Sequence, residues 1–418
     1  RRQRQMCIRD RYYKQALAQL RQHPLISIIG IVGTALSIFL IMLVVMMQQV
    51  KVAPFSPESN RNRFLHVHYM SISHKDWGNG TSNGPMSVQT AREVYKSLKT
   101  PEAVTVYCCM TVSTPVSLPG APAIGADVRE TDDTFFHVFD FQFTDGKPYD
   151  EATFTAGRPV AVITESISRA LFGSIQSVGK EFLLSHAPYR VVGVVKDVST
   201  LADMAYGQVW IPFTSTNLSN DTWSDNHMGM MSVTLLAHDR EDFDEIRAEA
   251  KRRMNEYNSI LADQGYTLID RNRPYDQETQ SISFAANLEP DLKAARRERV
   301  IIFIILLLVP AINLSSMTQS RLRQRVAEIG VRRAFGSTRI EMVGQIVMEN
   351  LVITLLAGAI GLLISILFAY WGTDILFAQP YSVTLNAPTV DSRILLQPST
   401  FLLSLIHISE PTRRSYIS

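Results

Sequence analysis

The chain has 418 residues, a net charge of +2 and a hydrophobic content of 46%. This length is more than one ordinary domain needs, so a membrane part and a separate soluble domain are expected. The nearly neutral charge gives no reason to expect a polyanionic partner, and nucleic acid is not predicted. The three cysteines, Cys7, Cys108 and Cys109, form no Cys-x-x-Cys pair and no His/Cys metal spacing, so we interpret them as small buried side chains.

Both ends of the chain differ in pattern from the segments next to them. Residues 1–11 and 405–418 show no periodicity that continues into their neighbours, and they resemble translated sequencing-adapter read-through. We therefore interpret them as foreign and exclude them from the fold prediction, as one excludes a tag. The natural C-terminal sequence is then expected to be missing from about residue 405 onward.

The first predicted element of the membrane part lies within residues 12–50. Residues 12–23 carry apolar side chains at helical spacing, which indicates an interfacial helix on the membrane surface. Residues 25–47 contain no charge and are long enough to cross about 30 Å of hydrocarbon. Gly30 and Gly33 in this first span predict close packing against another helix.

Residues 51–298 are soluble in character and predict one extracytoplasmic α+β domain with a mixed sheet. The glycine-rich run at 78–84 lacks Gly-Lys-Ser/Thr, so it predicts a surface loop and not a phosphate loop. Strands are predicted at 64–70, 159–164, 189–195, 208–212 and 232–237, and helices at 87–98, 165–172 and 241–262.

Three histidines lie close together near the start of this domain. His66 and His68 would share one face of a strand, and His74 follows shortly after, so a metal site is one interpretation. No carboxylate or cysteine completes a ligand set nearby. We therefore predict no metal site in this chain.

Residues 299–318 predict a second span. Pro310 is expected to kink this helix, and Asn313 is the one amide inside it. A polar residue at this depth is either functional or bonded to a neighbouring helix. We favour a structural role, a hydrogen bond to a neighbouring helix or to its own backbone, over a transport site.

A third span is predicted at residues 351–377, where Ala357 and Gly361 have the small-xxx-small spacing of packed helices. Residues 378–397 predict an outer loop, and residues 398–404 the start of a fourth span.

The segment between the second and third spans, residues 319–350, is rich in arginine and predicts two short helices. Gly336 supplies a left-handed stop for the first helix. Thr338 then opens the second, with Glu341 three residues on as a capping box. The excess of basic over acidic residues places this segment in the cytoplasm, and hence residues 51–298 outside. The basic residues are Arg321, Arg323, Arg325, Arg332, Arg333 and Arg339.

Two separate parts of the chain resemble FtsX/MacB-type ABC transporter permeases. The run Glu328-Ile-Gly-Val-Arg-Arg-Ala-Phe-Gly, followed by Glu349-Asn350, is similar to the cytoplasmic coupling segment that docks into the ATP-binding subunit in that family. The runs Ala161-Val-Ile-Thr-Glu-Ser and Tyr189-Arg-Val-Val-Gly-Val-Val resemble the MacB-type extracytoplasmic domain. The resemblance implies a four-span α-helical membrane protein, three spans being complete here, with the α+β domain inserted between spans 1 and 2.

The resemblance also implies a function. It implies a permease subunit of the bacterial cytoplasmic (inner) membrane that couples ATP hydrolysis by a separate cytoplasmic ATPase to movements of the outer domain, in export or efflux from the envelope. ATP and Mg²⁺ would bind to that ATPase, and no cofactor is expected in this chain. The other implied partners are a second permease chain, membrane lipid and, optionally, a periplasmic adaptor.

No sequence motif of catalytic grade is present. The chain has no Gly-x-x-x-x-Gly-Lys-Ser/Thr, no Gly-x-Ser-x-Gly and no His-Glu-x-x-His, so a non-catalytic subunit is expected. Few polar residues line the spans, which favours transmission of mechanical work over conduction of a solute. The residues expected to couple to the ATPase are Glu328, Gly330, Arg332, Arg333, Gly336 and Glu349.

Alternatives stay open at this point. The arginines could anchor to anionic lipid instead of an ATPase. Glu349 could pair with an arginine or remain hydrated at the membrane interface. The alternative function is a membrane-anchored extracytoplasmic sensor or scaffold that has no ATPase partner.

Overall fold

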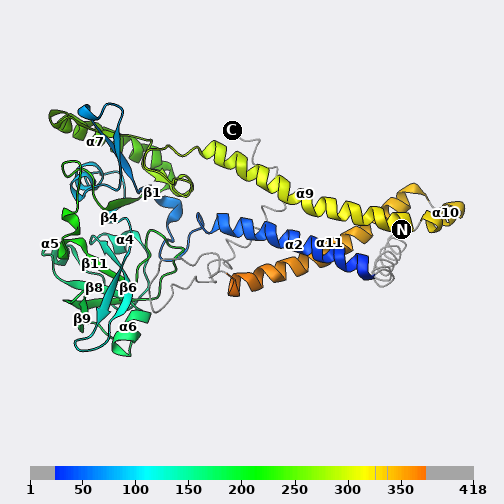
Figure 1. The fold of residues 1–418 in the computed structure, drawn as a ribbon, viewed down its shortest axis with the longest axis horizontal. Helices are drawn as coiled ribbons and strands as arrows, with labels where there is room; N and C mark the ends of the chain where they lie inside the picture. Colours follow the sequence, from blue (N-terminus) through cyan, green and yellow to red (C-terminus); the bar gives the residue numbers. More distant parts are fainter. Residues whose placement is uncertain (1–23, 325, 337, 373–418) are drawn as a thin grey trace. The chain divides into compact units, whose positions relative to one another are not determined.

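The computed structural model describes residues 24–372 apart from Arg325 and Ser337 (Figure 1). The described chain forms two compact units: a helical unit of residues 24–49 and 293–372, and an α/β unit of residues 50–292. The predicted interfacial helix at 12–23, the outer loop at 378–397 and the start of a fourth span at 398–404 lie outside the described residues. Residues 1–11 and 405–418 lie outside them as well.

One part of the α/β unit is a closed β-barrel. Four of the six strand pairings around the ring are antiparallel and two are parallel, and β-branched side chains such as Val128, Ile163 and Val191 fill its interior. Because the ring closes on itself, its six strands leave no open edge. The ring runs through β5 (Val112–Ser117), β6 (Ile124–Thr131), β11 (Val209–Pro212), β8 (Val160–Thr164), β10 (Ala187–Val195) and β9 (Glu181–Leu184), and β9 pairs back with β5.

The second part of the α/β unit has two sheets and a long helix. Helix α7 (Phe243–Leu261) buries a stripe that includes Ile246, Ala250 and Met254, spaced as one face of an amphipathic helix. These side chains share a core with the sheets. One sheet contains β4 (Ala103–Cys108), β12 (Met231–Leu236), β1 (Phe64–Val67) and β14 (Tyr275–Asp276), and the other contains β13 (Tyr266–Ile269), β2 (Met70–His74) and β3 (Thr81–Gly84).

Short elements complete the α/β unit. Strand β7 (Phe143–Gly146) pairs with β10 outside the ring, and α6 (Glu165–Phe172) packs against β8 and β10. The others are α3 (Val88–Thr90), α4 (Phe135–Val138), α5 (Glu151–Thr155), α8 (Gln277–Gln280), η1 (Arg61–Arg63), η2 (Lys75–Trp77), η3 (Ala91–Lys96), η4 (Phe213–Ser215), η5 (Leu218–Asn220), η6 (Arg240–Asp242) and η7 (Ala262–Gln264).

The helical unit is built from α2 (Pro24–Gln49), α9 (Leu292–Gln324), α10 (Val326–Ala334) and α11 (Arg339–Trp371). Three of these helices contain stretches long and apolar enough to cross a membrane, at Ser27–Gln49, Leu292–Ser320 and Met342–Trp371. Helix α9 continues through Pro310, and the kink expected there stays a prediction.

Small residues bring the three long helices into close contact. A Cβ placed on Gly30 would lie 1.9 Å from Met317 Sδ, and one on Gly33 would lie 2.6 Å from Asn313 Nδ2. The predicted role of both glycines in helix packing is therefore confirmed. Helices α2 and α11 also pack through an edge-to-face contact of Phe39 and Phe368, whose ring centroids are 5.5 Å apart.

Substitution of Gly361 by alanine should destabilise the packing of α2 and α11. The added Cβ would lie 2.7 Å from the backbone oxygen of Ala35, which no rotamer change can relieve. We expect Gly361→Ala to cost about 1–2 kcal/mol and to lower the thermal unfolding midpoint of the chain in detergent. Gly358→Ala is the control, because its Cβ meets only Ile38 Cδ1 at 3.9 Å. Equal midpoints for the two variants would contradict this account.

Three secondary-structure predictions were wrong in part. The single strand predicted at 64–70 is two strands, β1 and β2, which belong to different sheets. The glycine-rich run predicted as a loop contains β3, whose polar sequence has little strand propensity but pairs with β2 through the backbone. The helix predicted at 87–98 is a short α-helical turn followed by the wider turns of η3.

Candidate functional site

The segment between α9 and α11 has the helix–glycine–helix form that its sequence predicts. Helix α10 ends at Ala334, Gly336 has φ +89°, and α11 begins at Arg339. Glycine accepts this left-handed backbone without steric cost, and it therefore ends the first helix. Helix α11 then runs for 33 residues without interruption from this turn through the apolar stretch.

Most of the residues predicted to couple to an ATPase are exposed here. Glu328, Gly330, Arg333 and Gly336 are all exposed, and a Cβ added to either glycine would meet nothing within 4 Å. The side chain of Arg332 lies outside the part of the chain that the structure describes. The segment therefore presents charges of both signs and open space around its two glycines.

Large apolar side chains are exposed beside these charges. Phe335 is 88% exposed, Ile340 85% and Val331 57%. We call Glu328, Val331, Arg333, Phe335 and Ile340 the coupling surface. Exposed apolar side chains beside charges are typical of surfaces that contact a protein partner or a membrane.

Glu349 lies in a different environment from the other predicted residues. Its side chain is 7% exposed and accepts a hydrogen bond from Gln345 Nε2 at 2.9 Å. The neighbouring Asn350 accepts a hydrogen bond from Thr318 Oγ1 at 3.0 Å, which joins α9 to α11. Glu349 is thus buried among the helices, and the alternative in which it stays hydrated at the surface is wrong.

The amide of Asn313 bonds to a neighbouring helix. Its Nδ2 donates to Thr34 Oγ1 across the contact of α9 and α2, at 3.4 Å. Of the two hydrogen bonds favoured from the sequence, to a neighbouring helix or to its own backbone, the structure shows the first.

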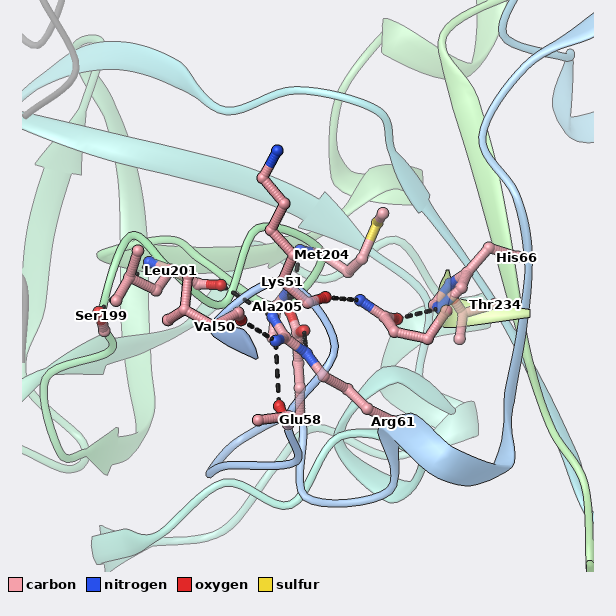
Figure 2. Close-up of polar contacts among 12 residues, drawn as sticks. Val50, Lys51, Glu58, Arg61, His66, Ser199, Leu201, Met204, Ala205 and Thr234 are labelled. Atoms are coloured by element: carbon pink, nitrogen blue, oxygen red, sulfur yellow. Dashed lines mark hydrogen bonds and ion pairs between the residues drawn. The ribbon is translucent and has the colours of Figure 1, made fainter. Parts of the chain in front are cut away.

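A second candidate site lies where the chain enters the α/β unit directly after α2 (Figure 2). Arg61 is 3% exposed, and its Nη1 donates to the carbonyl oxygens of Val50 at 2.6 Å and Ala53 at 3.1 Å. Its Nη2 donates to the carbonyl oxygen of Leu201 at 2.8 Å. One guanidinium therefore holds the entering segment against a distant loop of the same unit.

Glu58 completes this arrangement. Its Oε2 accepts from Arg61 Nε at 2.6 Å, and its Oε1 accepts from the backbone N–H groups of Met204 and Ala205, both at 2.9 Å. The carboxylate is 1% exposed, so the pair is buried and each of its oxygens has a partner. A buried charge is tolerated only when it is paired and hydrogen-bonded in this way.

A parallel contact holds the residue after Val50. Gln277 Nε2 donates to the carbonyl oxygen of Lys51 at 2.8 Å, while its Oε1 lies 2.8 Å from His66 Nε2. Because Oε1 can only accept, the His66 proton is on Nε2, and Nδ1 accepts from Thr234 Oγ1 at 3.1 Å. We call Glu58, Arg61, His66 and Gln277, with the backbone they hold, the joint.

The joint was not predicted from the sequence, and it gives His66 a role in holding the structure together. Both ring nitrogens of His66 are engaged, and His74 Nδ1 lies 3.4 Å from Asp76 Oδ2. Within residues 24–372 as described, no group of three or more His, Cys, Asp or Glu side chains is placed to hold a metal ion. Cys108 is buried and Cys109 half-buried, and both are free thiols.

Comparison with known proteins decides the family. Residues 25–253 match the family described as MacB-like periplasmic core domain, and residues 300–408 match the FtsX-like permease C-terminal family. The first match alone covers more than half of the chain. The chain belongs to the MacB/FtsX family of ABC transporter permeases. Its α/β unit is therefore a MacB-like extracytoplasmic α+β domain, and its long apolar helices are those of a membrane protein.

This permease is similar to proteins from several bacteria. It is 22% identical over 361 residues to the uncharacterized ABC transporter permease YknZ of Bacillus subtilis strain 168, which covers 84% of this chain and 83% of YknZ. It is 24% identical over 274 residues to the macrolide export ATP-binding/permease protein MacB of Burkholderia pseudomallei strain 1710b, over 65% of this chain and 39% of MacB. The permease thus matches less than half the length of that MacB.

Among solved structures, the periplasmic region of MacB from Actinobacillus actinomycetemcomitans is similar to half of this permease. The similarity covers 50% of this chain and 88% of that structure, with 18% identity and a TM-score of 0.35.

Proposed function

We propose that this chain is the permease subunit that transmits the movement of a separate cytoplasmic ATPase to the extracytoplasmic domain. The observation that carries the proposal is the continuity of α11. Its first turn carries Ile340 of the coupling surface, and the same helix forms a candidate span to Trp371. At 1.5 Å per residue this rod is about 50 Å long. A push on its first turn would displace the whole helix.

The path from α11 to the extracytoplasmic domain passes through α2. The two helices pack closely, with Gly361 of α11 against the backbone of Ala35. Helix α2 leads along the chain directly to Val50 and Lys51, whose carbonyl oxygens the joint holds. A hinge or shear movement needs rigid bodies and firm attachments, and the joint supplies an attachment.

The proposal assigns a role to each part of the coupling surface. Glu328 and Arg333 would make charged contacts with the ATPase, Phe335 and Ile340 would be covered by it, and Gly336 would set the angle of the turn. Arg332 is proposed for a charged contact by its place in the sequence. ATP and Mg²⁺ would be bound by the ATPase, and this chain would have no catalytic role.

The proposed assembly is a pair of permease chains with two ATPase subunits in the bacterial inner membrane. Each permease would have four spans, its arginine-rich segment in the cytoplasm and its α+β domain outside, between spans 1 and 2. The name of the MacB relative, an ATP-binding/permease protein, supports a permease that works with an ATP-binding part.

Few polar groups line the described spans, and Asn313 already bonds to Thr34, so transmission of mechanical work is favoured over conduction of a solute.

Reversal of one charge on the coupling surface should release the ATPase. The ATPase encoded beside this gene is co-purified from membranes with wild type, Glu328→Arg or Arg333→Glu. We expect its recovery to fall about tenfold in both variants, because unpaired or like charges would then face it. Arg252→Glu, at an exposed site on α7, is the control for the charge change of Arg333→Glu.

The possible results separate the competing functions. Recovery of ATPase by both variants at the wild-type level would indicate that the charges contact lipid instead. No ATPase with folded, inserted wild type would overturn the proposal and favour the membrane-anchored sensor or scaffold.

A further inference from the structure

An open cleft of about 680 Å³ lies on the extracytoplasmic domain, lined by residues of η2, β3, β13 and the loop at 223–228. Two of its lining residues are tryptophans that the solvent reaches: Trp77 is 40% exposed and Trp223 is 37% exposed. The volume is in the range of small-molecule sites. Two exposed indoles at one cleft provide a large aromatic surface for a ligand.

Both indoles are held in place from behind. Trp223 Nε1 donates to Ser82 Oγ at 3.1 Å, which fixes its ring against β3. The Trp77 ring packs edge-on against Tyr266 with centroids 5.8 Å apart, and Tyr266 in turn packs against His74 at 4.5 Å. The aromatic surface is thus fixed before any ligand binds, which lowers the entropy lost on binding.

The loop that carries Trp223 also places one carboxylate at the cleft. Ser224, Asp225 and Asn226 have φ of 50°, 51° and 67°, a left-handed conformation that is unfavourable for residues with side chains. Two backbone hydrogen bonds between Trp223 and Met228, at 3.0 and 3.1 Å, close the loop around these residues. The fold therefore holds Asp225 in one position at the cleft.

Asp225 sets the charge of the cleft. It is the one charged residue among the eight described residues that line it, and no described Lys, Arg or His forms an ion pair with it. Burial, followed by the hydrogen-bonded Asp225 carboxylate, raises the pKa of Tyr266, so this phenol stays neutral. The cleft consequently has a negative charge beside electron-rich aromatic faces.

We propose that this cleft binds an organic ammonium cation through the Trp77 and Trp223 faces and the Asp225 carboxylate. Aromatic faces attract alkylated ammonium groups, and a carboxylate supplies the opposite charge. An anion would be repelled by Asp225, and a neutral ligand would gain no charge–charge attraction from it. The inference is independent of the ATPase coupling proposed above, because it rests on the extracytoplasmic domain alone.

Choline is a suitable probe because it has an exact uncharged counterpart in shape, 3,3-dimethylbutan-1-ol. The full chain is purified in a polyoxyethylene detergent, which has neither charge nor sugar, and binding is followed by saturation-transfer NMR of the probe methyl groups. We expect saturable binding of choline and none of the alcohol. Asp225→Asn and Trp223→Leu should each weaken choline binding about threefold to fivefold, whereas Trp223→Phe should retain it.

Controls separate the cleft from general effects of charge and folding. Asp263→Asn removes an exposed carboxylate that does not line the cleft, and it should leave choline binding unchanged. Each variant should keep the wild-type unfolding midpoint and its recovery of ATPase. Equal binding of the alcohol, equal weakening by Asp263→Asn, or no saturable binding to folded wild type would each overturn the proposal. So would binding of chitotriose that Asp225→Asn leaves unchanged, because the cleft would then be a saccharide site.

Discussion

Substitution of Arg61 by methionine should lower the free energy of unfolding of the extracytoplasmic domain by about 3–5 kcal/mol. Methionine roughly fills the space of the aliphatic stem but leaves Glu58 buried at 1% exposure without its cation. It also removes the donors to the carbonyl oxygens of Val50, Ala53 and Leu201. The measurement is chemical unfolding of the purified full chain, followed by tryptophan fluorescence.

The control for this prediction is a second ion pair nearby. Arg63 pairs with Glu102, and both side chains are partly exposed, at 25% and 32%. Arg63→Met should therefore cost only about 1 kcal/mol. Adding Glu58→Gln to Arg61→Met should recover part of the loss, because no unpaired charge then stays buried. Equal costs for Arg61→Met and Arg63→Met would show that burial of the pair is unimportant.

Acidification should destabilise the same region through His66. Burial lowers its pKa from 6.5 to about 4, with the hydrogen bond to Gln277 acting in the opposite direction. The unfolded chain therefore takes up a proton near pH 6.5, and the folded chain only near pH 4. The stabilisation by neutral His66 is complete above pH 6.5 and is lost as the pH falls toward 4, by about 3 kcal/mol in all.

The test compares the unfolding free energies of wild type and His66→Gln between pH 7.5 and 4. The variant is needed as a reference because Glu130 titrates in the same range. Burial raises the pKa of Glu130 to about 7, and its contribution to the pH dependence of stability has the opposite sign to that of His66. Burial also lowers the pKa of His68, which acts in the same direction as His66. The wild-type curve should fall more steeply than that of the variant. Parallel curves would mean that His66 titrates alike in the folded and unfolded chains.

The features that the sequence predicts correctly are those with local causes. Gly336 ends a helix because glycine can adopt a left-handed backbone. The apolar runs of α2 and α11 were predicted because each residue of a span must suit the apolar interior of the bilayer. Gly33 and Asn313 were likewise assigned correctly to helix packing. The coupling contacts of Glu328 and Arg333 stay a prediction.

The features that were missed depend on residues far apart in the chain. Closure of the barrel needs β6 to pair with β11, and neither strand has a pattern that names its partner. The joint brings Arg61 to Leu201 and His66 to Gln277, across separations of 140 and 211 residues. A Glu58–Arg61 spacing of three residues is too common in sequences to indicate a buried pair.

Most of the hydrogen bonds that Arg61 and Glu58 make in the joint are to backbone atoms. Arg61 binds carbonyl oxygens of Val50, Ala53 and Leu201, and Glu58 binds N–H groups of Met204 and Ala205. Every residue has a backbone carbonyl oxygen, and every residue except proline has a backbone N–H group. These hydrogen bonds therefore depend on the path of the backbone and not on the side chains of the five residues, four of which are buried and are constrained by packing instead. A substitution that keeps the packing at these positions should therefore keep the attachment, as long as Glu58 and Arg61 stay in place.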